Sequence, residues 1–446
     1  MPAQEATPAA RAEPHERNRA GADWGLPGSQ ITRRAELYGT AFAVAGRYAA
    51  ARALPPERRP AAVARAHQRG AQDLYRRAVH LRGGFLKLGQ FASARPDLLP
   101  PAYVEELSRL QDRVPPAPAD AVRRIVEEDV GPVDGAFLNF DADSASAASL
   151  AQVHRATRHD GRPVAVKIQY PRVADVVPRE MRDTRRILLL LDRLLGSRVP
   201  GLPTIAHVLE ETVLEELDYR HEAENVERFV LNFAGEDAVV IPGVHRDLSA
   251  GRVLVLDWLE GENLARALRH ADRDVAEEAA LVLIDAYLKQ ILDDGFLHAD
   301  PHPGNFLLMA GPHRPRLGLV DFGACVELPE ATRVGLRMLY RSGLEGDVRL
   351  AGEALDRLGF RTRSGDLGSL MAWASLFSFE DGDDQVGRQA AWQRLMAAAR
   401  EDPVIRIPPE LVMVGRVLIV QTGLVSRIRP RWSMADLVAS HLGTAP

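Results

Sequence analysis

A short alternating stretch constrains the fold more than any other feature of this sequence. Residues 153–157 (VHRAT) and 163–168 (PVAVKI) alternate apolar and polar side chains, and Asp160 and Gly161 lie between them. Alternation of this kind is typical of strands, and Asp-Gly is a common tight turn. We therefore predict a β-hairpin here, with further strands at 239–244 and 252–258.

The rest of the chain follows mainly helical spacing, apart from one expected strand pair at 306–309 and 317–321. The 446 residues suit two or three structural units. We expect an α+β fold with a small β-rich lobe followed by a larger helical lobe. The predicted parts are a disordered tail, an N-terminal helical extension, the small lobe and the large lobe, at 1–30, 31–119, 120–257 and 258–446.

Composition excludes several classes of protein. A formal net charge of −5 argues against nucleic-acid binding driven by bulk electrostatics. The single cysteine, Cys325, excludes an internal disulfide framework and a CxxC metal site. The longest apolar run, Leu411–Val425, is interrupted by Arg416 and Gln421, so it predicts a buried amphipathic helix rather than a membrane span. The N-terminus has no apolar core, so we expect no secretory signal.

Two basic segments each allow two interpretations. Between Arg52 and Arg82 the sequence predicts an arginine-rich helix, which is either a membrane-surface helix or an ordinary solvated helix face. The segment 426–432 (SRIRPRW) either contacts lipid headgroups or caps the large lobe.

Three motifs occur in an order that suits a nucleotide triphosphate. Lys167 ends an alternating strand after Val-Ala-Val, Asp300 and Asn305 have the HxDxxxxN spacing behind His298, and Asp321 begins Asp-Phe-Gly. The same order is found in the protein-kinase fold. It predicts that Lys167 binds phosphates, that Asp300 is the catalytic base or positions water, and that Asn305 and Asp321 bind magnesium. Backbone groups of residues 257–261 are the expected contact for adenine.

The histidines of the same loop offer an alternative. His298, Asp300 and His302 together suggest a metal hydrolase, but the sequence has neither a helical His-x-x-x-His pair nor a carboxylate-rich second site. We expect both histidines to be hydrogen-bonding framework residues.

Three features of ordinary protein kinases are missing. The stretch 144–154 (SASAASLAQVH) replaces a GxGxxG loop, Ala299 stands where protein kinases have arginine, and a helical pattern resumes at Pro329. The sequence leaves no room for an activation loop on which a peptide substrate binds, which argues against an ordinary protein kinase.

These residues resemble the AarF/UbiB family of atypical kinases, bacterial relatives of the mitochondrial coenzyme Q kinases. The resemblance covers residues 83–431 and includes a KxGQ motif with Lys87 and Gln90, an ExD motif with Glu216 and Asp218, and an alanine-rich loop. Ser146 and Ala151 depart from the usual alanine and glycine, so we expect altered loop stiffness with binding kept.

The resemblance implies roles for the remaining site residues. The KxGQ helix is expected to pack over the cleft and to direct Lys87 and Gln90 at the nucleotide. Glu222 is the expected partner of Lys167. Glu216 and Asp218 are expected on the same long helix as Glu222, facing the KxGQ helix or the metal. The expected cover of the nucleotide is a stiff loop. Its residues are Ala147, Ala148 and Ser149.

The resulting functional hypothesis is an atypical kinase or ATPase that uses ATP (or ADP) and Mg²⁺. The resemblance further implies a role in isoprenoid quinone biosynthesis, an isoprenoid or quinone lipid partner, biosynthetic enzymes as protein partners, and a cytoplasmic location with peripheral contact to the inner face of the cell membrane. Nucleic acid is not an expected partner. The alternatives are a phosphotransferase of the aminoglycoside or choline kinase type, and a nucleotide-binding scaffold without catalysis.

Overall fold

The computed structural model describes residues 28–93, 100–110, 117–147, 150–195, 210, 213–311, 314–366, 402, 404–406 and 408–444.

The first sheet contains the predicted hairpin. This antiparallel sheet has the order β1 (Asn139–Ala147), β2 (Ala151–Thr157), β3 (Pro163–Gln169), β5 (Val253–Asp257). Gly161 takes φ +84° in the β2–β3 turn, a conformation that glycine adopts at little cost. Val166 and Ile168 of β3 are fully buried on one face, so Lys167 between them lies on the other.

A second sheet and two short strand pairs belong to the other lobe. The second sheet has the order β4 (Val239–Val240), β9 (Arg316–Leu319), β8 (Phe306–Met309), β6 (Glu262–Asn263). The short pairs are β7 (Phe296–His298) with β10 (Cys325–Glu327), and β11 (Arg361–Thr362) with β12 (Val404–Arg406). The predicted pair at 306–309 and 317–321 is confirmed as β8 and β9. Residues 258–261 join the first sheet to the second, at the predicted hinge.

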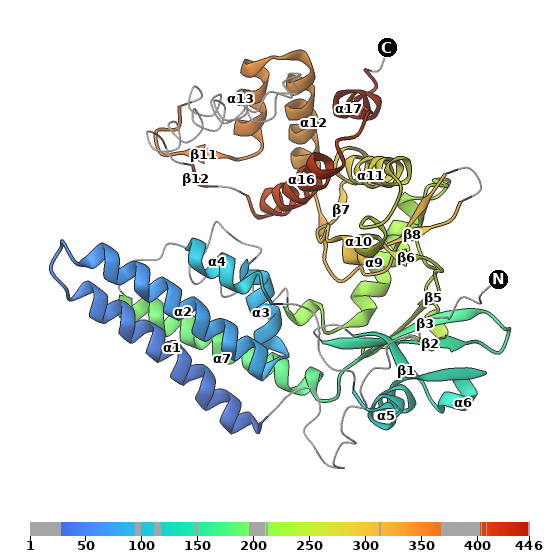
Figure 1. Ribbon diagram of the computed structural model, residues 1–446, viewed down its shortest axis with the longest axis horizontal. Helices are drawn as coiled ribbons and strands as arrows, with labels where there is room; N and C mark the ends of the chain where they lie inside the picture. Colours follow the sequence, from blue (N-terminus) through green and yellow to red (C-terminus); the bar gives the residue numbers. More distant parts are fainter. Residues whose placement is uncertain are drawn as a thin grey trace, which may run out of the picture.

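The N-terminal helices form a layer beside the first sheet (Figure 1). They are α1 (Gln30–Arg52), α2 (Arg59–Leu81), α3 (Gly84–Ser93) and α4 (Pro101–Leu107), with α7 (Val173–Leu195) packed against α1 and α3. The buried Arg33 of α1 donates to Glu180 Oε1 of α7 at 2.6 Å and to the Leu81 carbonyl at 2.6 Å. The short helices α5 (Ala119–Asp129) and α6 (Val133–Ala136) pack against the sheet.

The arginine-rich helix predicted between Arg52 and Arg82 is α2. Its buried face consists mainly of small residues, including Ala66, Gly70 and Ala71, so the arginines lie on the solvent side. Arg77 pairs with Glu36 of α1 at 2.7 Å. Within the described part of the chain, no helix combines the length and apolar character needed to cross a bilayer.

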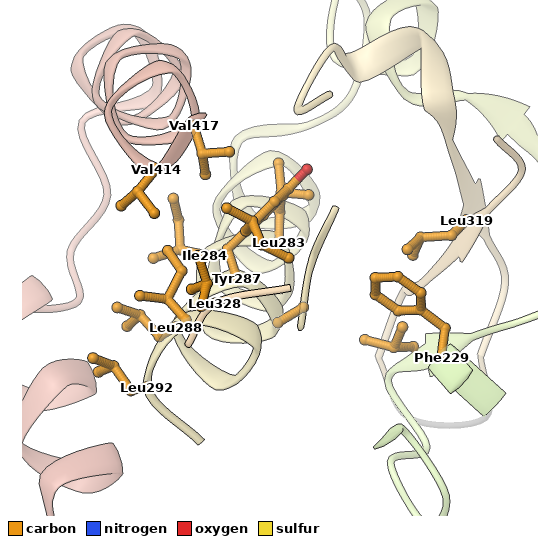
Figure 2. Close-up of a cluster of buried hydrophobic side chains, with 14 of the residues drawn as sticks. Phe229, Leu283, Ile284, Tyr287, Leu288, Leu292, Leu319, Leu328, Val414 and Val417 are labelled. Carbon is orange, nitrogen blue, oxygen red and sulfur yellow. The ribbon is translucent and has the colours of Figure 1, made fainter. Parts of the chain in front are cut away.

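The large lobe is built around α11 (Arg273–Leu288). The other helices of this lobe are α10 (Leu264–Ala267), α12 (Glu330–Glu345), α13 (Val348–Arg357), α16 (Pro409–Ile428) and α17 (Met434–Leu442). Helix α9 (Tyr219–Asn232) lies within the range predicted for the small lobe, but its buried residues belong to the same apolar cluster as α11. Figure 2 shows Ile284 and Leu288 of α11 in the same buried cluster as Val414 and Val417 of α16. The apolar run Leu411–Val425 is therefore the buried amphipathic helix that the sequence predicted.

The segment 426–432 begins in the last turn of α16, which ends at Ile428, and its later residues contact α11. Arg431 Nε donates to Glu277 Oε2 at 2.9 Å, and the indole nitrogen of Trp432 donates to the Glu277 carbonyl at 3.2 Å. These bonds support the interpretation in which the segment caps the large lobe.

One prediction about the helices is wrong. Glu216 and Asp218 do not share a helix with Glu222, because α9 begins at Tyr219. Glu216 lies in a turn, and the side chain of Asp218 caps α9 by accepting a hydrogen bond from the Arg220 amide at 3.0 Å. The physical reason is that aspartate competes well for unpaired amides at a helix start, which favours a cap over a helix interior.

His441 makes the attachment of α17 sensitive to pH. Its ring nitrogens lie 2.6 Å from Asp293 and 3.1 Å from Asp285, and although burial lowers the pKa of His441, these carboxylates raise it to about 9. A histidine whose pKa is higher in the folded protein than in the unfolded chain contributes its full stabilisation at pH values below the unfolded pKa. That stabilisation is lost as the pH rises through the pKa of the folded protein. We expect His441→Gln to cost about 1 kcal/mol near pH 6, given the partial exposure of the carboxylates, and nearly nothing near pH 10.

Urea unfolding of both proteins at the two pH values measures this difference. His221→Gln, at an exposed position of α9, is the control and is expected to change neither value. An equal cost of His441→Gln at both pH values would contradict the charge-based explanation.

Candidate active site

Lys167 connects the two lobes at the centre of the site. Its ammonium group lies 2.6 Å from Glu222 Oε1 of α9 and 3.3 Å from Asp321 Oδ1. Only 16% of the Lys167 side chain and 5% of the Glu222 side chain are exposed, whereas the Asp321 carboxylate remains 46% exposed. The main-chain amide of Phe322 donates to Glu222 Oε1 at 3.3 Å, which fixes Asp-Phe-Gly against α9.

Opposite charges favour the ionised forms of these groups. Burial by itself lowers the pKa of Lys167, but Asp321 and Glu222 raise it well above the usual range. Burial by itself raises the pKa of Asp321, but the positive charge of Lys167, followed by that of Lys87, keeps this pKa well below the usual range. Burial raises the pKa of Glu222, and Lys167 offsets part of that rise. The result is a fixed cation between two carboxylates, beside an accessible anionic oxygen.

The loop between β7 and β8 brings Asp300 and Asn305 together. The amide nitrogen of Asn305 donates to Asp300 Oδ2 at 2.9 Å and to the Asp300 carbonyl at 3.2 Å. The Val320 amide donates to the Asn305 carbonyl at 3.1 Å, so Asn305 lies next to the strand end that carries Asp321. The spacing of the two motifs thus produces the expected proximity of Asn305 and Asp321.

Both histidines of this loop are framework residues. His298 Nε2 lies 2.5 Å from the Asp321 carbonyl, and His302 Nδ1 accepts the Gly304 amide at 3.0 Å. Among the described residues, no group of three or more His, Cys, Asp or Glu side chains forms a candidate metal site. These contacts give the metal-hydrolase alternative no support.

The KxGQ helix adds a second lysine to the site. Lys87 Nζ of α3 lies 2.8 Å from Glu216 Oε1, and its charge also acts on Asp321. Burial raises the pKa of Glu216, and Lys87 lowers it in part. Lys87 and Glu216 therefore lie beside Lys167 and Asp321, whereas Asp218 is engaged as the cap of α9.

Four predicted residues fall wholly or partly outside the described structure. Gln90 belongs to α3, and Ala147 is the last residue of β1. The side chains of both residues lie outside the described structure. Ala148 and Ser149 lie outside the described residues. β1 ends at Ala147 and β2 begins at Ala151, and Ala147 pairs with Gln152 between the two strands.

Lysine usage is a further signal in the sequence. Lysine and arginine together number 56, yet lysine occurs only at Lys87, Lys167 and Lys289. Two of these three lie in the candidate site. Since lysine offers a compact, strongly hydrated charge and arginine a planar fork, the two are not interchangeable at a phosphate site. The rarity of lysine would have singled out both residues before any motif was recognised.

Arg416 is a site residue that the sequence reasoning missed. Its Nη2 atom donates to Asp300 Oδ1 at 2.8 Å, from the middle of α16. The only sequence signal is the position of a charged residue inside an otherwise apolar run.

Comparisons with known proteins agree with this geometry. A family model described as the ABC1 atypical kinase-like domain matches residues 109–355. The chain is 31% identical over 395 residues to Activity of BC1 Complex Kinase 1, chloroplastic, of Arabidopsis thaliana, covering 84% of this chain and 56% of the relative. The chain is also 33% identical over 368 residues to Activity of BC1 Complex Kinase 7, chloroplastic, of Arabidopsis thaliana. That match covers 80% of this chain and 52% of the relative. The chain thus spans about half the length of these curated relatives.

A solved structure shares the fold. The Mycobacterium tuberculosis protein Rv3197, solved in complex with erythromycin, superposes with a TM-score of 0.59 at 26% identity, over 86% of this chain and 98% of that one. The predicted kinase-like α+β fold with N-terminal helices is confirmed, and so is the predicted family. This chain belongs to the family of ABC1 atypical kinase-like proteins.

Proposed function

We propose that this protein is an ATP-dependent atypical kinase or ATPase that binds ATP (or ADP) with Mg²⁺. The observation that carries the proposal is the contact of Lys167 with both Glu222 and Asp321, next to the bonded pair Asp300 and Asn305. In this proposal Glu222 holds Lys167 where it meets the phosphates, and Asp300 receives or orients the proton of the attacking group.

The donor set fits a magnesium ion. Asn305 uses its amide nitrogen on Asp300, so its amide oxygen remains an acceptor within the described contacts, and Asp321 offers an exposed carboxylate oxygen. These are the hard oxygen ligands that magnesium prefers, and substrate phosphates normally complete its coordination. When bound, the ion would supply positive charge to the phosphate oxygens.

The acceptor is proposed to be an isoprenoid or quinone lipid, its precursor, or water. The segment from Asp321 to the start of α12 at Glu330 is short, and Lys87 and Glu216 lie beside the site, which disfavours a docked peptide. The family resemblance supports a role in isoprenoid quinone biosynthesis, peripheral to the inner face of the cell membrane and with biosynthetic enzymes as partners.

Covalent labelling tests the nucleotide site directly. An acyl-phosphate derivative of ADP transfers its acyl group to lysines near the bound phosphates, and Lys289 is the only other lysine in the chain. Mass spectrometry is expected to find label on Lys167 or Lys87, suppressed by Mg-ATP, with Lys289 unaffected. Calorimetry that detects no binding of ADP or ATP with magnesium would overturn the proposal.

Lys87 is expected to control the preference between ATP and ADP. Lys87→Met removes a cation beside Glu216 and Asp321, so the more highly charged triphosphate loses more attraction than the diphosphate. We expect the affinity for ATP to fall about tenfold and the affinity for ADP to fall less. A tenfold loss corresponds to about 1–2 kcal/mol of binding free energy, the size expected for one partly screened charge contact. Calorimetry with each nucleotide measures both constants. Arg76→Met, on the exposed side of α2, is the control. Equal losses for both nucleotides would contradict this role.

The acceptor class separates this proposal from a soluble small-molecule kinase. ATP turnover is expected to rise with lipid vesicles or phenolic quinone precursors, and not with choline or an aminoglycoside. Because Rv3197 was solved with erythromycin, that macrolide is a rational additional compound for the binding assay.

A further inference from the structure

The loop that carries Asp300 has no lysine or arginine of its own. Residues 298–305 read HADPHPGN, and Ala299, which is 2% exposed, fills the place that arginine has in protein kinases. A catalytic carboxylate beside a triphosphate would therefore face a second anion with no nearby cation from its own loop.

Arg416 supplies that cation from a distant part of the chain. Its Nη2 atom lies 2.8 Å from Asp300 Oδ1, while Asn305 Nδ2 holds Oδ2 at 2.9 Å. Two donors on two different oxygens fix both the position and the rotation of the carboxylate. Removing either donor leaves a carboxylate that can turn about its terminal bond.

The exposure of the pair argues against a purely structural role. The side chains of Arg416 and Asp300 are each 33% exposed. Ion pairs with this much solvent access contribute little to folding. Helix α16 is anchored instead by its apolar face, where Val414 and Val417 are 2% and 0% exposed. The helix therefore holds Arg416 in place without depending on the ion pair.

We propose that Arg416 is the positioning residue for Asp300 in phosphoryl transfer. Helix α16, which carries Arg416, is then part of the active site. This inference rests on the proposed function. In the step concerned, the acceptor oxygen forms a bond to the γ-phosphorus, the bond from that phosphorus to the β–γ bridging oxygen breaks, and ADP leaves with the electron pair. Asp300 takes the acceptor's proton, and Arg416 holds the carboxylate in the orientation that receives it.

The test compares full-length wild type, Arg416→Met and Arg416→Lys by ATP turnover and by calorimetry with Mg-ADP. For Arg416→Met we expect kcat to fall about 10- to 100-fold, the loss of one charge-assisted hydrogen bond at the reacting centre. KM for ATP and the dissociation constant of Mg-ADP are expected to change less than about twofold, since the nucleotide contacts remain. Arg416→Lys and added guanidinium ion with the Met variant are each expected to restore part of kcat.

Controls separate this role from general damage. Arg427→Met changes an exposed arginine on the same helix and is expected to leave kcat unchanged. A kcat of Arg416→Met equal to or above that of wild type overturns the inference while leaving the proposed function intact. A fall in kcat accompanied by lost Mg-ADP binding, with no rescue, also overturns it, because a positioning role does not alter nucleotide affinity. Absence of nucleotide binding in the wild type overturns the proposed function itself.

Discussion

Asp321→Asn is expected to lower magnesium-dependent ATP turnover at least about 1000-fold, since a bound metal contributes several kcal/mol of charge stabilisation in the transition state. The substitution keeps the shape of the side chain and an oxygen that can accept the Gly323 amide, now bonded at 3.1 Å. It removes the negative charge that Lys167 contacts at 3.3 Å and that would bind magnesium. The Asp-Phe-Gly backbone therefore stays in place while the metal site is lost.

Calorimetry and a coupled ATPase assay measure the two parts of this prediction. Mg-ADP affinity is expected to fall strongly, while affinity measured in EDTA changes little. Asp218→Asn is the matched control, because asparagine caps a helix as well as aspartate and Asp218 lies at the start of α9. The control is expected to retain turnover within about twofold, as expected for a preserved cap. Wild-type turnover in Asp321→Asn would refute Asp321 as a metal ligand.

Lys167→Met is expected to destabilise the fold by about 3–5 kcal/mol, the usual cost of removing one partner from a buried ion pair. Glu222 is 5% exposed, and among the described residues the hydrogen bond that it keeps without Lys167 is that from the Phe322 amide at 3.3 Å. An uncompensated buried carboxylate takes up a proton more readily, so its folded pKa rises further. A carboxyl group whose pKa is raised in the folded protein reduces stability above its unfolded pKa. This part of the deficit should therefore shrink as the pH falls through the folded pKa and disappear below the unfolded pKa of about 4.3.

A double-mutant cycle isolates the pair. Lys167→Met with Glu222→Gln is expected to cost clearly less than the sum of the two single substitutions, because no buried charge is left unpaired. Urea unfolding of the four proteins at neutral and acidic pH gives the energies. Arg349→Met, in an exposed pair with Glu353 on α13, is expected to cost less than about 0.5 kcal/mol. If the losses of unfolding free energy from Lys167→Met and Glu222→Gln simply add, the contact between the two side chains contributes no interaction energy.

The sequence was most informative where short-range rules apply. Alternation and the Asp-Gly turn predicted the β2–β3 hairpin, and an interrupted apolar run predicted α16. The chain order of the motifs at Lys167, Asp300 and Asp321 indicated the kinase-like fold. The error at Glu216 and Asp218 arose because a helical pattern was continued through a residue that prefers to cap.

Sequence alone determined the residue types, their order and the family, since strand period, turn chemistry and motif spacing are all local properties. Only the tertiary structure decided which distant side chains meet. Arg416 and Asp300 are separated by 116 residues, and Lys167 and Asp321 by 154. The packing of α16 on α11, and of α9 against β5, the strand next to β3, brings them together. That packing depends on the burial of whole apolar faces rather than on any local pattern.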